Sequence, residues 1–220
     1  MSLRLHRGGK FRGWVGTRLG GDAELGDRAW RRFLHLTGVA VLFYFVIPRN
    51  LFVYFSTEVV LLLALELVLV LEFLRHVAGL ELPTIRPYES DRIGSYTFYA
   101  IALVIAVIAF PVPIAVMVVL GTALVDPLIG ELRRIPEGRK FYPTAPIAVY
   151  AALGLATLLI VGRWSLPGAI LGALLAAVSG VATEYPKYTV LDDDLAMTVV
   201  PGALLLGVLY LWPSLPGWGS

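Results

Sequence analysis

Cysteine is absent from this sequence of 220 residues. A chain without cysteine has no disulfide framework, no thiolate nucleophile and no cysteine-ligated zinc or iron–sulfur site. Charged residues are also scarce, at 15%, whereas hydrophobic residues make up 58% and the mean hydropathy is +0.78. This composition is too apolar for an ordinary soluble domain and indicates an integral membrane protein.

The sequence contains several long apolar runs that could form membrane-spanning helices. A helix needs about 20 apolar residues to cross the hydrocarbon core of a bilayer. Seven segments approach this length: 33–47, 58–74, 95–110, 112–129, 145–162, 167–183 and 195–212. We therefore predict an all-α, polytopic bundle of about seven transmembrane helices, or six if the short first segment lies partly inside the bundle. Residues 31–213 would form this domain, between a basic, flexible arm (1–30) and a short extracytoplasmic tail (214–220).

Positive charge is distributed unevenly along the chain. Of the 18 Lys and Arg residues, all but Arg49 and Arg163 precede the first predicted span or lie in the even-numbered connections. Because cytoplasmic loops carry an excess of Lys and Arg, this distribution predicts a cytoplasmic N-terminus and an extracytoplasmic C-terminus. The basic residues of the arm would act as this topology signal or, alternatively, contact the anionic headgroups of membrane lipids.

The second predicted span contains three carboxylates, Glu58, Glu66 and Glu72. Carboxylates at membrane depth are costly, so we expect them to face the interior of the bundle and to be paired. Glu72 and Arg75 are three residues apart and can pair with each other, although Glu72 could instead act in catalysis. Glu66 lies deeper in the span, and the sequence suggests no partner for it.

A further acidic residue, Asp126, lies near the inner end of the fourth predicted span. Pro127 and Gly130 are expected to break the helix, and a basic loop would follow. The basic residues are Arg133, Arg134, Arg139 and Lys140. A carboxylate next to such a loop suits a Mg²⁺–phosphate site, with the carboxylate on the metal and the basic groups on phosphate oxygens. The alternative is an interfacial loop that only follows the positive-inside rule.

Glu184 ends the sixth predicted span, and three consecutive aspartates, Asp192, Asp193 and Asp194, open the seventh. One aspartate is explained by capping of the helix N-terminus and by the helix dipole. Three adjacent carboxylates repel each other, which favours a cation between them and Asp126. At the first span, Arg31 and His35 are four residues apart and therefore share one helical face.

In their order along the chain, these segments resemble motifs of the CTP-dependent polyprenol kinases, a family that includes dolichol kinase, phytol kinase and a CTP-using diacylglycerol kinase. "RRFLH" is similar to the family's Arg-Lys-x-x-His opening, "LVLEFLR" to its second-helix Glu and Arg, and "RPYESDRIGSYTFYAIALVIAVIAFP" to its charged loop and following helix start. "GRKFYPT" resembles a Gly-Lys-Lys-Ser/Thr stretch, and "DDDLAM" resembles Asp-Asp-Asn-Leu-Thr. The resemblance covers about Arg31 to Gly202, and Val125 stands where the family has Gly before its Asp.

The resemblance implies a membrane lipid kinase that transfers the γ-phosphate of CTP to an isoprenoid alcohol of the polyprenol or dolichol type, at the cytoplasmic face of the cell membrane. Mg²⁺ would be the cofactor and CTP the co-substrate, with ATP as the alternative nucleotide, and no nucleic-acid partner is expected. The predicted catalytic residues are Asp126, Asp193, His35 and Glu184. The predicted metal ligands are Asp126, Asp192, Asp193 and Asp194. The predicted nucleotide-binding residues are Arg31, Arg133, Arg134, Arg139 and Lys140.

Two other functions remain open from the sequence. A membrane cytidylyltransferase that makes a CDP-lipid would share CTP, Mg²⁺ and topology with the kinase but would release pyrophosphate. A polytopic transporter would use Glu66 and Glu72 as ion- or proton-coupling carboxylates.

Overall fold

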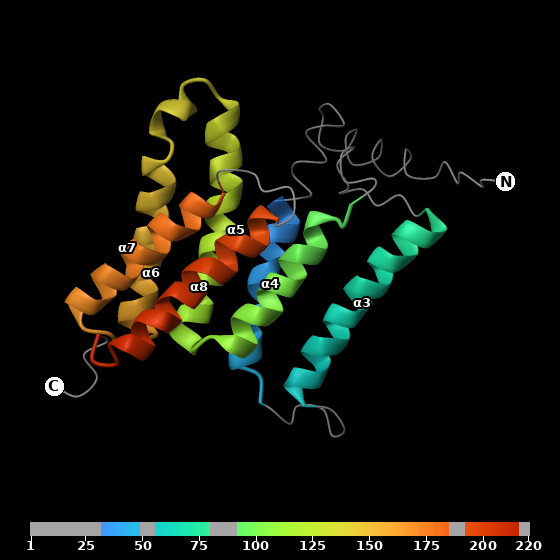
Figure 1. Cartoon of the computed structure of the whole chain (residues 1–220), viewed down its shortest axis with the longest axis horizontal. Coiled ribbons are helices and arrows are strands. Elements are labelled where there is room, and N and C mark those ends of the chain that lie inside the picture. Colours follow the sequence, from blue (N-terminus) through green and yellow to red (C-terminus); the bar gives the residue numbers. More distant parts are fainter. Residues whose placement is uncertain (1–31, 49–55, 80–91, 185–191, 216–220) are drawn as a thin grey trace.

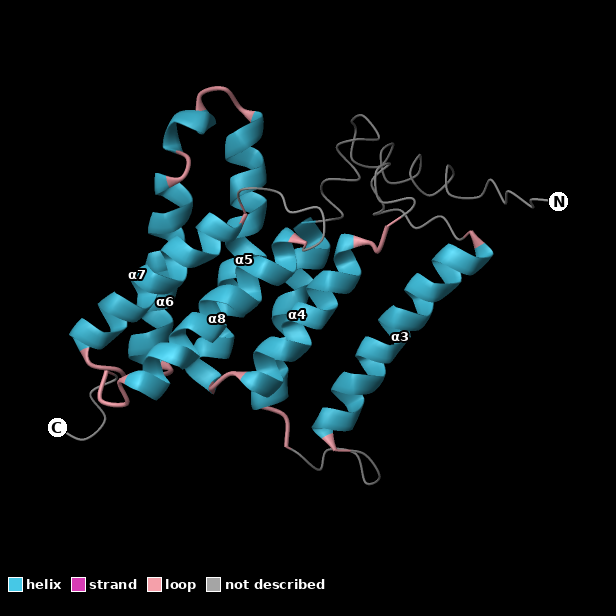
Figure 2. Cartoon of the chain, in the orientation of Figure 1, coloured by secondary structure: helices cyan, strands magenta, loops and turns pink. Residues whose placement is uncertain are grey.

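The computed structural model describes residues 32–48, 56–79, 92–184 and 192–215 (Figure 1). These residues form helices and no strand, which confirms the all-α prediction (Figure 2). The first helix, Arg32–Phe45, ends in the 3₁₀ segment η1 (Val39–Phe45). The others are α3 (Thr57–Ala78), α4 (Ser95–Ala109), α5 (Val112–Arg134), the 3₁₀ helix η3 (Gly138–Phe141), α6 (Thr144–Ile160), α7 (Leu166–Thr183) and α8 (Asp193–Leu211).

Each of the seven apolar segments coincides with one helix of this series. Of the helices in the described part of the chain, α5, α7 and α8 are long and apolar enough to cross a membrane. The first helix, α4 and α6 are apolar but shorter. Membrane association therefore has direct support from three helices.

Helix α5 lies in the middle of the bundle, where it contacts η1, α4, α6, α7 and α8. Helices α6, α7 and α8 pack in sequence along one side of it, whereas α3 lies at the opposite edge and packs chiefly on α4 (Figure 1). Small residues allow these close contacts. The ring of Tyr150 on α6 fills the space beside Gly121 and Gly180, where an added Cβ would lie 2.2 Å and 2.6 Å from ring atoms.

The structure corrects the expectation that Pro127 and Gly130 end the fourth span. Helix α5 continues through both residues to Arg134. A proline removes one backbone donor and kinks a helix, but the buried helices around α5 support the chain on both sides of Pro127. Arg133 therefore lies in the last turn of α5 rather than in a loop. It is seven residues after Asp126, so both side chains lie on the same face of the helix.

Successive helices run in opposite directions, so their ends alternate. The starts of the first helix, α4 and α8 and the ends of α3, α5 and α7 lie at one end of the bundle (Figure 1). At this end of the bundle, α5 extends beyond the last residue of α7 and the first residue of α8 (Figure 1). The charged residues discussed below gather at this end.

Candidate active site

Helix α8 begins with a capping aspartate. The side chain of Asp192 accepts a hydrogen bond from the backbone N–H of Asp194 at 3.1 Å, and its carbonyl accepts the first helical bond from Ala196. This is the arrangement expected of an aspartate N-cap. Asp193 and Asp194 occupy the first turn, and Asp194 is 6% exposed. Asp192 therefore caps α8, and one of its carboxylate oxygens also lies within 4.8 Å of oxygens of Asp193 and Asp194, so the three predicted metal ligands remain together.

Asp194 and Asp126 meet at His35 of the first helix. The imidazole Nε2 of His35 lies 3.7 Å from Asp126 Oδ2 and 3.9 Å from Asp194 Oδ2. One ligand atom from each of these three residues lies within 4.8 Å of the other two. Three helices that are far apart in sequence thus place an imidazole and two carboxylates together.

A second set of three acidic residues shares Asp126. Oxygen atoms of Asp126, Glu184 and Asp193 all lie within 4.8 Å of one another. Glu184 is the C-cap residue of α7 and is 4% exposed. All four residues predicted to be catalytic are therefore neighbours, although they come from the first helix, α5, α7 and α8.

The donor atoms of this second set fit Mg²⁺. They are carboxylate oxygens, which hard divalent cations prefer. Neighbouring ligands of an octahedral Mg²⁺ lie about 3 Å apart, so these oxygens, which are within 4.8 Å of one another, would draw closer together around an ion. The set with His35 fits Mg²⁺ less well, because imidazole suits transition metals better.

Arg133 is the basic residue that the structure brings to the acidic cluster. Its guanidinium forms an ion pair with Glu184 and donates a hydrogen bond to Tyr142 Oη at 2.7 Å. It also lies 4.5 Å from the centre of the Tyr142 ring. Arg139 Nε donates to the Arg133 carbonyl at 2.8 Å, which holds the η3 segment against the end of α5.

Among the described residues, the structure shows no contact between the other predicted phosphate-binding residues and the acidic cluster. Arg134 is 3.6 Å from Glu131, which also pairs with Arg32 of the first helix. Arg139 and Lys140 are exposed beside the site. Arg31 lies outside the described residues.

Tyr99 of α4 supports His35 and was missed in the sequence. Its hydroxyl donates to the backbone carbonyl of His35 at 2.8 Å, and the two rings lie 4.7 Å apart. Gly38 permits this approach, since an added Cβ there would lie 2.2 Å from Tyr99 Oη. The sequence indicates this contact only indirectly: in "RRFLHLTG", Gly38 follows His35 by one helical turn and leaves room for a large side chain there.

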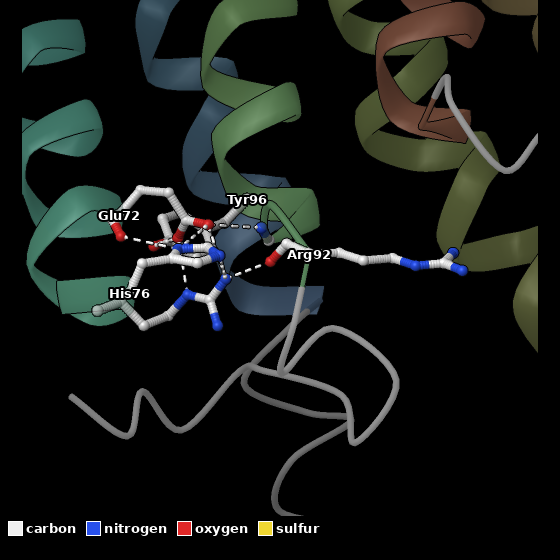
Figure 3. A network of polar contacts seen from close by, with 6 residues as sticks. Glu72, His76, Arg92 and Tyr96 are labelled. Atoms are coloured by element: carbon white, nitrogen blue, oxygen red, sulfur yellow. Dashed lines mark hydrogen bonds and ion pairs between the residues drawn. The ribbon is translucent and has the colours of Figure 1, made fainter. Parts of the chain in front are cut away.

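A separate polar network joins α3 to α4 (Figure 3). Arg75 donates to the Glu72 carboxylate from Nε at 2.9 Å and from a terminal nitrogen at 2.7 Å. The backbone N–H of Gly94 donates to Glu72 at 3.0 Å, and the hydroxyl of Tyr96 donates to the same carboxylate. Arg75 also donates to the Arg92 carbonyl. The Glu72–Arg75 pairing considered from the sequence is thus present.

Glu66 does not follow the expectation that carboxylates of this span face inward. It is exposed, on the side of α3 turned away from α4. Glu58 differs, since its carboxylate accepts a hydrogen bond from Tyr44 at 3.3 Å. Glu66 is exposed because α3 lies at the edge of the bundle, where only one face of the helix is packed.

Comparisons with known proteins find no match: no protein-family model, curated protein or solved structure is detectably similar to this chain.

Proposed function

We propose that this protein is a membrane lipid kinase that transfers the γ-phosphate of CTP to the hydroxyl of an isoprenoid alcohol. The observation that carries the proposal is the convergence of His35, Asp126, Glu184 and Asp193 at one end of an apolar bundle, with Arg133 beside them. An acidic cluster for a metal, a base and a guanidinium are the parts that phosphoryl transfer needs. The choice of CTP and of an isoprenoid acceptor comes from the family resemblance.

The acidic set of Asp126, Glu184 and Asp193 would hold Mg²⁺. The bound ion would neutralise charge on the triphosphate. Arg133 is placed to exchange Glu184 for a phosphate oxygen, because guanidinium groups bind both carboxylates and phosphates in the same geometry. Arg139 and Lys140 are exposed next to it and would add positive charge around the nucleotide.

His35 is assigned the proton transfer. The alcohol oxygen attacks the γ-phosphorus, the bond from that phosphorus to the bridging oxygen breaks, and CDP leaves. The alcohol proton passes to Nε2 of His35, and the carboxylates of Asp126 and Asp194 stabilise the resulting imidazolium. Tyr99 keeps the imidazole in place through the backbone of His35.

The position of the site at the end of the helices suits a lipid alcohol. An isoprenoid tail would stay among apolar helices while its hydroxyl reaches the charged end, so that positioning and electrostatics supply most of the catalysis. The proposed topology has seven spans with a cytoplasmic N-terminus. A reporter inserted near Gly138 should then be cytoplasmic and one after Ser220 extracytoplasmic; both on one side would contradict seven spans.

The decisive experiment is a transfer assay with purified protein, Mg²⁺, nucleotide and a panel of lipid alcohols. With γ-labelled CTP the label should enter the lipid and CDP should be released, and γ-labelled ATP should be the poorer donor. The Asp126→Asn protein, purified in parallel, controls for contaminating kinases. Label that enters lipid only from α-labelled CTP, with release of pyrophosphate, would identify a cytidylyltransferase instead. No transfer to any lipid would overturn the proposal.

The transporter alternative has weaker support. Its two candidate coupling groups are Glu72, which is held by Arg75, Tyr96 and Gly94, and Glu66, which faces away from the bundle. Among the described helices, neither carboxylate lies where several helices meet.

A further inference from the structure

The ion pair between Arg133 and Glu184 joins a buried side chain to a more accessible one. The side chain of Glu184 is 6% exposed, whereas that of Arg133 is 27% exposed. Glu184 also belongs to the acidic set with Asp126 and Asp193, whose oxygens lie within 4.8 Å of one another. The guanidinium therefore holds one carboxylate of this set and is the member of the pair that a dissolved ion reaches more easily.

Two further contacts keep Arg133 at the site. The terminal nitrogen that pairs with Glu184 also donates to the hydroxyl of Tyr142 at 2.7 Å. The backbone carbonyl of Arg133 accepts a hydrogen bond from Arg139 Nε at 2.8 Å. Neither of these contacts involves Glu184, so both can persist when the guanidinium binds another anion. Arg133 can thus exchange its acidic partner without leaving the site.

The same ion pair opposes the binding of a divalent cation. A cation held by Asp126, Asp193 and Glu184 uses the negative charge of Glu184, which the guanidinium already offsets. It would also lie close to a second positive charge, which repels it. A phosphate group that binds the guanidinium removes both obstacles, since arginine binds phosphate and carboxylate oxygens with the same donor geometry. Phosphate binding would therefore strengthen cation binding, and thermodynamic linkage makes the effect reciprocal.

We propose that the Arg133–Glu184 pair is a latch that opens for a metal–polyphosphate complex and keeps the acidic set from binding a divalent cation tightly when no phosphate is present. The polyphosphate takes Arg133, and the released Glu184 completes the set for the cation. The inference rests on the proposed function for the identity of the ligand, a nucleoside triphosphate. The latch itself is a property of binding and needs no phosphoryl transfer.

The first test measures the affinity of the purified protein for Mn²⁺ without nucleotide, from the free Mn²⁺ signal in electron paramagnetic resonance. Mn²⁺ is the probe because it prefers the same oxygen ligands as Mg²⁺. Arg133→Gln should bind Mn²⁺ roughly tenfold more tightly than the parent, a factor usual for coupled sites. Arg133→Lys should lie between the two, because it keeps the charge and loses the guanidinium geometry. Glu184→Gln should bind Mn²⁺ more weakly than the parent, since a ligand is lost.

Arg134→Gln is the matched control for the metal measurement. Arg134 is the adjacent arginine and pairs with Glu131 at 3.6 Å, outside the acidic set. Its loss should change the Mn²⁺ affinity by no more than about twofold, because exposed charges are screened. An equal rise in Arg134→Gln would overturn the latch, and so would unchanged or weaker Mn²⁺ binding in the Arg133 variants. Arg133→Lys decides alone if Arg133→Gln does not fold.

The second test measures the reciprocal effect, the equilibrium binding of labelled CTP in the presence of EDTA. Glu184→Gln should bind metal-free CTP roughly tenfold more tightly than the parent, because Arg133 is released. Glu137→Gln is the control, since Glu137 is an exposed carboxylate of the same segment, and an equal gain there would overturn the latch. Both tests are independent of turnover. The predicted coupling without phosphoryl transfer would reject the kinase and keep the latch, whereas transfer with no gain of Mn²⁺ affinity in the Arg133 variants would reject the latch alone.

Discussion

Two clusters of charged residues lie at the same end of the bundle and are built in opposite ways. At Glu72, one buried carboxylate receives donors from Arg75, Gly94 and Tyr96, so its charge is fully used to hold α3 to α4. At Asp126, carboxylates from three helices approach one another within 4.8 Å. The first arrangement is typical of a structural ion pair. The second concentrates like charge, which Arg133 offsets in part at Glu184 and which a bound cation would offset further.

Neutralising the acidic cluster should have the largest effect. Asp126→Asn and Asp193→Asn should each lower phosphoryl transfer by roughly 10³-fold, because electrostatic stabilisation of the transferred group is lost. Their melting temperatures should change little, since Asn fills the same space. Activity and thermal unfolding in detergent would be measured together.

Asp192→Asn is the matched control for these variants. Asn caps helices as well as Asp does, and Asp192 already serves as the cap of α8, so activity should stay within a few-fold of the parent. Near-normal activity in Asp193→Asn with unchanged Mg²⁺ dependence would return Asp193 to a surface role. The assignment would then depend on Asp126, Glu184 and Arg133.

The Glu72 network should show the reverse behaviour, with a large loss of stability. Glu72→Ala leaves the Arg75 guanidinium buried without its carboxylate, which costs about 3–5 kcal/mol. The double variant Glu72→Leu with Arg75→Leu should recover much of that loss, because no lone charge remains. Denaturant unfolding of the three proteins measures both values. A single variant as stable as the double one would show that the pair is not a structural unit.

The effect of Mg²⁺ on thermal stability should depend on the Asp126 cluster and not on the Glu72 network. A ligand at 100 times its dissociation constant stabilises the folded state by about 2.7 kcal/mol, so Mg²⁺ should raise the melting temperature and EDTA should reverse the effect. The Asp126→Asn, Asp193→Asn double variant should show no such shift. Glu72→Ala should melt lower but keep the full shift. An equal shift in the double variant would place the ion elsewhere on the protein.

The helices could be predicted because each apolar run approaches the length that a bilayer requires, and α5, α7 and α8 reach it. The approach of Asp193 to Asp126 was also predicted from the sequence, since both were placed at the same end of their spans. Glu184 was predicted to be catalytic, but its approach to Asp126 is seen only in the structure. The continuity of α5 through Pro127 could not be predicted, because a local rule was overridden by the packing of surrounding helices. The outward direction of Glu66 likewise depends on which helices flank α3, and spacing along the chain does not contain that information.

Side-chain partners were harder to predict than helix ends. Arg133 was expected to bind phosphate, but its ion pair with Glu184 and its contact with Tyr142 arise from tertiary placement of α7 and η3. The role of Tyr99 could not be predicted, because an aromatic residue in an apolar helix is normally expected to be a core residue. Its role became visible only when α4 was seen to join the two clusters, with Tyr96 bonded to Glu72 and Tyr99 to His35.

The link through α4 gives the smallest and most selective prediction. Tyr99→Phe keeps the ring beside His35 and removes only the hydrogen bond to its backbone, so stability should fall by about 1 kcal/mol. The turnover number should fall roughly tenfold as the imidazole loses its fixed position, at about 1.4 kcal/mol per factor of ten, while the KM for CTP and the Mg²⁺ dependence stay constant. Tyr150→Phe is the matched control: Tyr150 is fully buried, and its hydroxyl has no hydrogen-bond partner in the described residues. Its loss should leave both activity and stability unchanged or improved. If both variants lose the same activity, tyrosine removal acts through packing alone, and His35 does not depend on Tyr99 for its position.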